Sequence, residues 1–187
     1  KPMQQAAADK PILGVFQEGG LPFALDAANQ PEKSKVPTLA DMTRKAISVL
    51  SSNKNGFVMQ VEGGKVDWAA HANDAGALLY DQIAFDEAVR VAIEFAERDK
   101  QTLVIITTDH GNANPGLFYG NDANKNFNTL IRHRFTNEWI LNGVGNQTST
   151  KALMDRVMEA QGWTLKEEEA KELLGYYTSL SDEGLYN

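Results

Sequence analysis

Residues 103–110 read Leu-Val-Ile-Ile-Thr-Thr-Asp-His, a run of apolar and β-branched residues that leads directly into two side chains able to bind a metal. The run is apolar on both faces, as in a strand buried between two layers. Residues 57–61 and 11–16 are similar apolar runs, and glycine pairs follow both of them. We therefore predict three buried strands, at 11–16, 57–61 and 103–107.

Helical patterns separate these runs. Thr38 is followed three residues later by Asp41, which predicts a helix start with an imperfect capping box. A second helical pattern extends from about residue 66 to residue 99, with apolar residues recurring at threes and fours. Alternating strands and helices predict an α/β fold with a parallel sheet and flanking helices.

The character of the chain changes after residue 116. Three helical segments are expected, at 129–141, 149–161 and 165–177, the last capped by Thr164 with Glu167. We therefore divide the chain into residues 1–116, part of an α/β core, and residues 117–187, a helical insertion or cap. Trp139, Trp163, Tyr176 and Tyr177 form either the small core of this second part or contacts between subunits.

Composition limits the possible functions. The formal net charge of −7 argues against a nucleic-acid partner, because no basic stripe is present to neutralise phosphates. The chain has no cysteine, so a metal must be held by carboxylate, imidazole, carbonyl or water, which favours zinc or magnesium. No apolar run reaches the length of a membrane span.

Ionisable residues gather where ligands bind in parallel sheets, at the carboxyl ends of the strands. Glu62 directly follows the second predicted strand, and Asp109 and His110 follow the third. Asp67 and His71 are four residues apart, a spacing that places them on one side of a helical turn. Each of these three groups of residues, taken alone, is more often a turn carboxylate, a helix cap or a chance pair. Their occurrence together at one edge of one sheet favours a metal site.

These residues belong to a recognisable pattern. Residues 61–67 (Val-Glu-Gly-Gly-Lys-Val-Asp), His71, residues 86–89 (Asp-Glu-Ala-Val) and residues 107–110 (Thr-Thr-Asp-His) together resemble the alkaline phosphatase family. Residues 37–43 fit as well, and the similarity extends from about residue 12 to residue 114. The fold that the resemblance implies is alkaline-phosphatase-like, with residues 1–116 as part of an α/β metallohydrolase core.

The resemblance also implies a ligand set. Glu62 is expected to bind one Mg²⁺, Asp67 and His71 the first of two Zn²⁺ ions, and Asp109 and His110 the second. Such a site hydrolyses phosphate monoesters, with a serine that is transiently phosphorylated between two metal ions. The family also suggests small phosphate monoester substrates, a possible homodimer, and a periplasmic or secreted location.

The chain departs from the family pattern in two ways. It has no Asp-Ser-Ala-like nucleophile motif, so none of its own residues is expected to be the catalytic nucleophile. The third histidine of the first zinc also has no clear equivalent, since His133 lies in a basic Arg-His-Arg context that suits helix packing better. We therefore expect a fragment that supplies most metal ligands and is inactive alone.

Two alternatives remain open at this point. One is another member of the wider superfamily, such as a phosphodiesterase, a sulfatase-like hydrolase or a phosphosugar mutase, which the residues 62–71 pattern disfavours. The other is a catalytically dead domain used for binding or assembly, and its metal content would distinguish it from an enzyme.

Overall fold

A computed structural model describes residues 3, 10–30, 35–111 and 120–179 of the chain. The chain divides into two compact units, Lys1–Pro115 and Gly116–Asn187. The roles predicted for the two parts, hydrolase core and insertion or cap, remain predictions.

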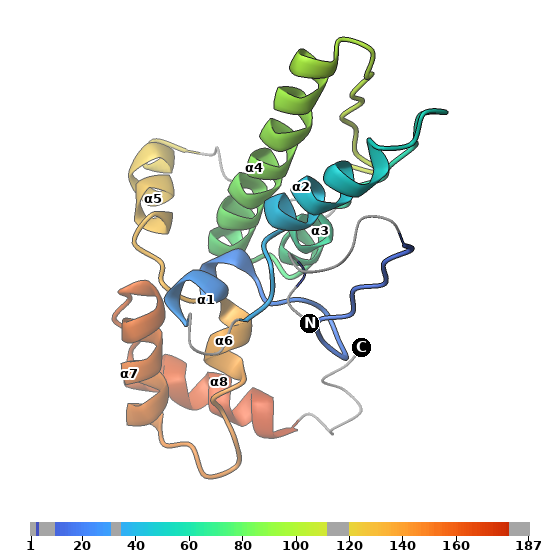
Figure 1. Cartoon of the computed structure of the whole chain (residues 1–187). Coiled ribbons are helices and arrows are strands. Elements are labelled where there is room, and N and C mark those ends of the chain that lie inside the picture. Colours follow the sequence, from blue (N-terminus) through green and yellow to red (C-terminus); the bar gives the residue numbers. More distant parts are fainter. Residues whose placement is uncertain (1–2, 4–9, 31–34, 112–119, 180–187) are drawn as a thin grey trace. The chain divides into compact units, whose positions relative to one another are not determined.

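The first unit is organised around one long helix, α4 (Figure 1). This helix comprises Ala75–Asp99, 25 residues, and is therefore about 37 Å long. It contacts three shorter helices, namely α1 (Ala24–Asn29), α2 (Leu39–Leu50) and α3 (Gly64–His71). Phe23, Ala69 and Ala77 form a small buried core in this unit.

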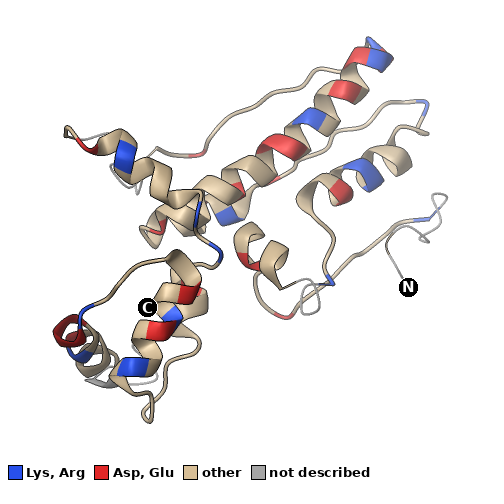
Figure 2. Ribbon diagram, turned by 90° about the vertical axis from the view of Figure 1, so that its left-hand side faces the viewer, with Lys and Arg blue, Asp and Glu red and all other residues tan. Residues whose placement is uncertain are grey.

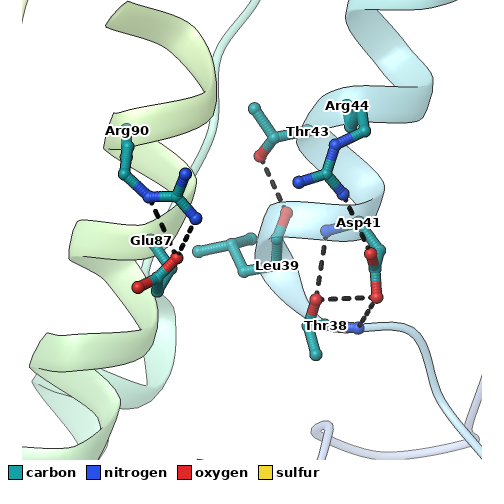
Figure 3. A network of polar contacts seen from close by, with 7 residues as sticks. All are labelled: Thr38, Leu39, Asp41, Thr43, Arg44, Glu87 and Arg90. Atoms are coloured by element: carbon teal, nitrogen blue, oxygen red, sulfur yellow. Dashed lines mark hydrogen bonds and ion pairs between the residues drawn. The ribbon is translucent and has the colours of Figure 1, made fainter. Parts of the chain in front are cut away.

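Helix α2 begins at the predicted residue. The Thr38 hydroxyl accepts a hydrogen bond from the Asp41 amide at 3.1 Å, and the Thr38 amide donates to the Asp41 carboxylate at 3.3 Å. Figure 3 shows this reciprocal pair and the Arg44 guanidinium that binds the same carboxylate. Thr38 and Asp41 therefore form a complete capping box, which satisfies donors that a helix start otherwise leaves unpaired.

The single helix predicted from about residue 66 to residue 99 is wrong, because the structure has two helices there. Helix α3 ends in a Schellman motif: Asn73 has φ 51°, and the Asp74 amide donates to the Ala69 carbonyl at 3.0 Å. Asp74 then caps α4 by accepting from the Ala77 amide at 2.9 Å. Asn and Asp suit these two positions, so the Asn73-Asp74 pair was the signal of the break.

Helix α1 was not predicted, and its cap comes from far along the chain. Both carboxylate oxygens of Asp81, a buried residue of α4, lie 3.2 Å from the Ala24 amide nitrogen. Burial raises the pKa of Asp81 to about 6, against the opposing effects of the Ala24 hydrogen bond and of Lys65. The negative charges of Asp26 and Asp74 raise this pKa further.

The predicted parallel sheet is not formed within the described residues. Residues 11–16, 57–61 and 103–107 carry no strand pairing there, and Figure 1 draws them without arrows. None of these residues is buried, and several apolar side chains among them are exposed, with Val58 98% and Leu103 81% accessible. A strand exists only when its amides and carbonyls pair with a neighbour. The three apolar runs have a composition typical of strands, but they pair with no neighbour in the part of the chain described, so the three predicted strands are not confirmed there.

The second unit contains four helices in its described part: α5 (Ala123–Leu130), α6 (Asn137–Leu141), α7 (Thr150–Gln161) and α8 (Glu167–Ser179). The predicted helix at 149–161 is confirmed as α7, capped by Ser149. The predicted helix at 129–141 is wrong, since a turn separates α5 from α6, which Thr136 caps. A buried core holds the unit together, made of Phe135, Ile140, Leu153, Ala160 and Ala170.

The predicted cap at Thr164 is also wrong, because α8 begins at Glu167. The Lys166 amide instead donates to the Glu169 carboxylate at 2.8 Å. Glu167 pairs with Lys171 at 2.8 Å, and this hydrogen bond lowers the pKa of Glu167. Three consecutive glutamates in the first turn suit the positive end of the helix dipole.

Arg156 of α7 closes the C-terminal end of the short helix α6. Its guanidinium donates to the carbonyl oxygens of Trp139 and Ile140 and lies 3.5 Å from the Trp139 ring centroid. Desolvation lowers the pKa of Arg156. Trp139 in turn stacks on Phe135 at 4.0 Å, so the arginine ties the end of α6 to the core.

Charged residues of both signs occur along α4 (Figure 2). Arg90 forms ion pairs with Glu87 and Glu94, one turn before and after it. Across the described residues, no helix combines the length and the apolar character that crossing a bilayer requires.

Candidate metal centre

Three of the five predicted ligands lie together. One carboxylate oxygen of Asp67 and one ring nitrogen each of His71 and His110 all lie within 4.8 Å of one another. Asp67 Oδ1 is 3.2 Å from His71 Nε2 and 3.6 Å from His110 Nε2. The two imidazole rings meet edge to face, with centroids 5.8 Å apart. A single carboxylate oxygen is therefore flanked by two imidazoles.

Helix α3 positions two of these ligands. Asp67 and His71 lie four residues apart on it, so their side chains project from the same side. On another side of the helix, Ala69 and Ala70 are buried, and Ala69 belongs to the core that also contains Phe23 and Ala77. The small alanines let α3 pack closely against its neighbours while the ligands remain accessible.

His110 comes from the segment that follows the third predicted strand. The Asp109 carboxylate accepts from the His110 amide at 2.9 Å, and the Thr108 hydroxyl donates to the His110 carbonyl at 2.6 Å. These local bonds shape the turn that presents the imidazole. Asp109 Oδ2 lies 3.6 Å from His110 Nε2, and the Asp109 side chain is 82% exposed.

The structure groups the ligands differently from the two expected zinc pairs. Asp67, expected with His71 at the first zinc, contacts His110 as well, which was expected at the second. Asp109 lies beside this three-residue group without joining it. Glu62 is also outside the group: its exposed carboxylate lies near Gly64, the first residue of α3. A carboxylate at this position suits the positive end of the helix.

The donor set fits a divalent cation of the zinc type. Zn²⁺ binds imidazole nitrogen and carboxylate oxygen at about 2.0–2.2 Å, so neighbouring ligands of a tetrahedral ion lie about 3.3 Å apart. The distances of 3.2 and 3.6 Å from Asp67 Oδ1 match this spacing. The three side chains are between 41% and 52% exposed, so an ion and a substrate can reach them from solvent.

His133, the histidine considered as a third ligand of the first zinc, and Trp68, a residue of α3, both have defined surroundings. His133 is buried in the second unit, and its Nε2 accepts from the Trp163 indole N–H at 3.5 Å, in keeping with a packing role. Trp68 is half exposed on α3, and its ring faces the ammonium of Lys65. Lys65 could not be singled out from the sequence, because its contacts with the Trp68 and Phe23 rings form only in the folded chain.

Comparison with known proteins identifies the family. The family model described as alkaline phosphatase matches residues 1–172. Alkaline phosphatase 4 of Bacillus subtilis (strain 168) is 39% identical over 150 residues, which cover 79% of this chain and 31% of that protein. The alkaline phosphatase of Escherichia coli (strain K12) is 38% identical over 126 residues, covering 58% of this chain and 27% of that protein. The chain thus spans about a third or less of the length of these relatives.

The fold agrees with this assignment. The crystal structure of Thermus thermophilus alkaline phosphatase superimposes with a TM-score of 0.85 at 30% sequence identity, covering 92% of this chain and 37% of that one. The predicted resemblance and the alkaline-phosphatase-like fold are therefore confirmed, although the sheet itself is not formed in the described residues. The chain belongs to the alkaline phosphatase family.

Proposed function

We propose that these residues serve a metal-dependent phosphatase that hydrolyses small phosphate monoesters. The observation that carries the proposal is the convergence of Asp67, His71 and His110 on one point, from two segments that are distant in sequence. Family membership supports the reaction class.

The proposed ligand set extends beyond the three clustered residues. Asp67, His71, His110 and Asp109 would hold two zinc ions, and Glu62 would hold one magnesium ion. When bound, such ions polarise the phosphoryl oxygens, stabilise the leaving oxygen and lower the pKa of a bound water.

The residues of the chain make this chemistry possible in three ways. Asp67 supplies negative charge that offsets part of the charge of a cation, and the histidines supply neutral nitrogen donors. The exposure of the cluster leaves room for a phosphate ester. The chain carries a net charge of −7, which repels a phosphate dianion, so cations bound at this point supply the positive field that the substrate requires.

The proposal includes a serine nucleophile that becomes transiently phosphorylated, supplied from outside these 187 residues. A homodimer and a periplasmic or secreted location, which the family resemblance implies, are further parts of it. None of the residues named above is proposed to form the covalent intermediate.

The test uses the full-length enzyme that contains this chain. We expect hydrolysis of a chromogenic phosphate monoester at alkaline pH, loss of activity on treatment with a chelator, and recovery with Zn²⁺ and Mg²⁺. Parallel assays with a phosphate diester and a sulfate ester distinguish the monoesterase from the related hydrolases. A metal-free, inactive full-length protein would contradict the proposal and favour a binding or structural role.

A further inference from the structure

The ammonium of Lys65 lies between two aromatic rings at the first turn of α3. Its Nζ is 3.9 Å from the Trp68 ring centroid and 4.2 Å from the Phe23 ring centroid. Both distances are well within the range of cation–π attraction. Phe23 is 4% exposed and precedes α1, so Lys65 links α3 to a different segment of the unit.

A second segment approaches the same place. A Cβ atom on Gly20 would lie 2.7 Å from the tip of the Trp68 ring and 3.3 Å from Lys65 Nζ. Only a residue without a side chain lets the backbone come so close to the ring. By contrast, a Cβ on the neighbouring Gly19 would have no atom within 4 Å. The close approach is therefore specific to Gly20, and it confines Trp68 and Lys65 from outside α3.

Helix α3 depends on such contacts. It has eight residues, and its N-cap, Gly63, provides no side-chain hydrogen bond. Helices this short are not stable by themselves in water, so tertiary contacts must hold α3 in place. Lys65 and Trp68 are three residues apart on α3, and Trp68 is in turn three residues before the ligand His71, which pairs with Asp67 at a spacing of four. Contacts that hold Lys65 and Trp68 in place therefore also fix the part of the helix that carries the two ligands.

We propose that Lys65 is a positioning residue of the metal centre, which holds α3 through Trp68 and Phe23 so that Asp67 and His71 keep their geometry. In this role Lys65 acts through the two aromatic rings and is not itself a ligand of the cation. The inference rests on the proposed function only in requiring that a divalent cation binds at this cluster.

The affinity for a cation distinguishes a positioning role of Lys65 from a purely electrostatic effect of its charge, because the two change the affinity in opposite directions when Lys65 is replaced. Removing a positive charge near a cation site strengthens cation binding, whereas loosening the ligands weakens it. In Zn²⁺ competition titrations with the 187-residue chain, we expect Lys65→Met to bind about 3-fold to 10-fold more weakly, and Lys65→Arg to recover most of the affinity. Lys54→Met removes the same charge from an exposed turn and should leave the affinity unchanged.

A second pair of variants leaves α3 unaltered. Gly20→Ala places a methyl group against Trp68 and should weaken Zn²⁺ binding, whereas Gly19→Ala has open space and should not. Hydrogen exchange of the amides in residues 64–71, measured without metal, should be faster in Lys65→Met and Gly20→Ala than in their controls. Hydrogen exchange reports the stability of α3 even if the altered chains bind no metal.

The outcomes separate the two claims. If the parent chain binds Zn²⁺ and neither Lys65→Met nor Gly20→Ala changes the affinity or the exchange of residues 64–71, the positioning role is overturned and the metal centre stands. Stronger binding by Lys65→Met also overturns the positioning role, since it indicates electrostatics alone. If the parent chain binds no divalent cation, the metal centre fails and the positioning role fails with it.

Discussion

His110 Nε2 lies 3.6 Å from Asp67 Oδ1, although the two residues come from different segments of the first unit. The same oxygen lies 3.2 Å from His71 Nε2. The group therefore depends on tertiary structure, because α3 alone provides only Asp67 and His71. Any change that separates the 108–110 turn from α3 should dismantle the site without altering a ligand.

The capping box of α2 provides a direct test of local stability. Thr38→Ala removes the hydroxyl that accepts from the Asp41 amide, and should lower the free energy of unfolding by about 1 kcal/mol. Ser48→Ala, an exposed change within the same helix, should alter it by less than about 0.5 kcal/mol. Urea unfolding followed by circular dichroism measures both, and equal effects would contradict the assigned cap.

Asp81 makes folding stability depend on pH. Its pKa rises from an ordinary 3.8 to about 6 in the folded chain. A group whose folded pKa is raised stabilises the fold in its protonated form. This contribution is complete below pH 3.8 and is lost as the pH rises through about 6. This rise in pKa corresponds to a change of about 3 kcal/mol in the free energy of unfolding.

Asp81→Asn should remove this dependence, because an amide cannot ionise and its oxygen still accepts from Ala24. Relative to the variant, the parent chain should lose unfolding free energy as the pH rises from about 3.8 to about 6, by about 3 kcal/mol in total. Urea titrations at several pH values measure the difference. If the difference in unfolding free energy between the parent chain and Asp81→Asn stays constant, or if the parent chain gains stability relative to the variant as the pH rises, Asp81 is not a desolvated acid.

Gly143 leaves space for the Arg156 guanidinium, and a Cβ at residue 143 would collide with it. Gly143→Ala should therefore displace the arginine from the carbonyls at the end of α6 and lower the free energy of unfolding by about 1–3 kcal/mol. At Gly145, a Cβ would have no atom within 4 Å, so Gly145→Ala serves as the control. Thermal unfolding of the two variants should differ, and identical midpoints would contradict the role of Arg156.

Features that depend on near neighbours in sequence were the most predictable. The Thr38–Asp41 capping box and helix α7 follow from residues within one or two turns of each other. The grouping of Asp67 with His71 follows from helical spacing in the same way. Placing His110 beside them required an assumption about where strands end, and the contact is present even though no sheet forms in the described residues.

Features that depend on distant residues were not predictable. The cap of α1 is a carboxylate 57 positions away in sequence, and nothing near Ala24 indicates it. A strand likewise requires a partner, so the composition of residues 103–107 indicates the tendency but not the pairing. Lys65 is an ordinary lysine in sequence, and its contacts with Phe23 and Trp68 appear only after folding.

Co²⁺ titration of the 187-residue chain tests whether Asp67, His71 and His110 bind a divalent cation. Co²⁺ reports its ligands through visible absorption, so nitrogen and oxygen ligation can be followed without any enzymatic assay. We expect saturable absorption in the parent chain and in Glu97→Gln, which alters an exposed carboxylate of α4, and loss of this absorption in Asp67→Asn and His110→Ala. Equal spectra in all four proteins, or no binding by the parent chain, would contradict a metal centre built on Asp67, His71 and His110.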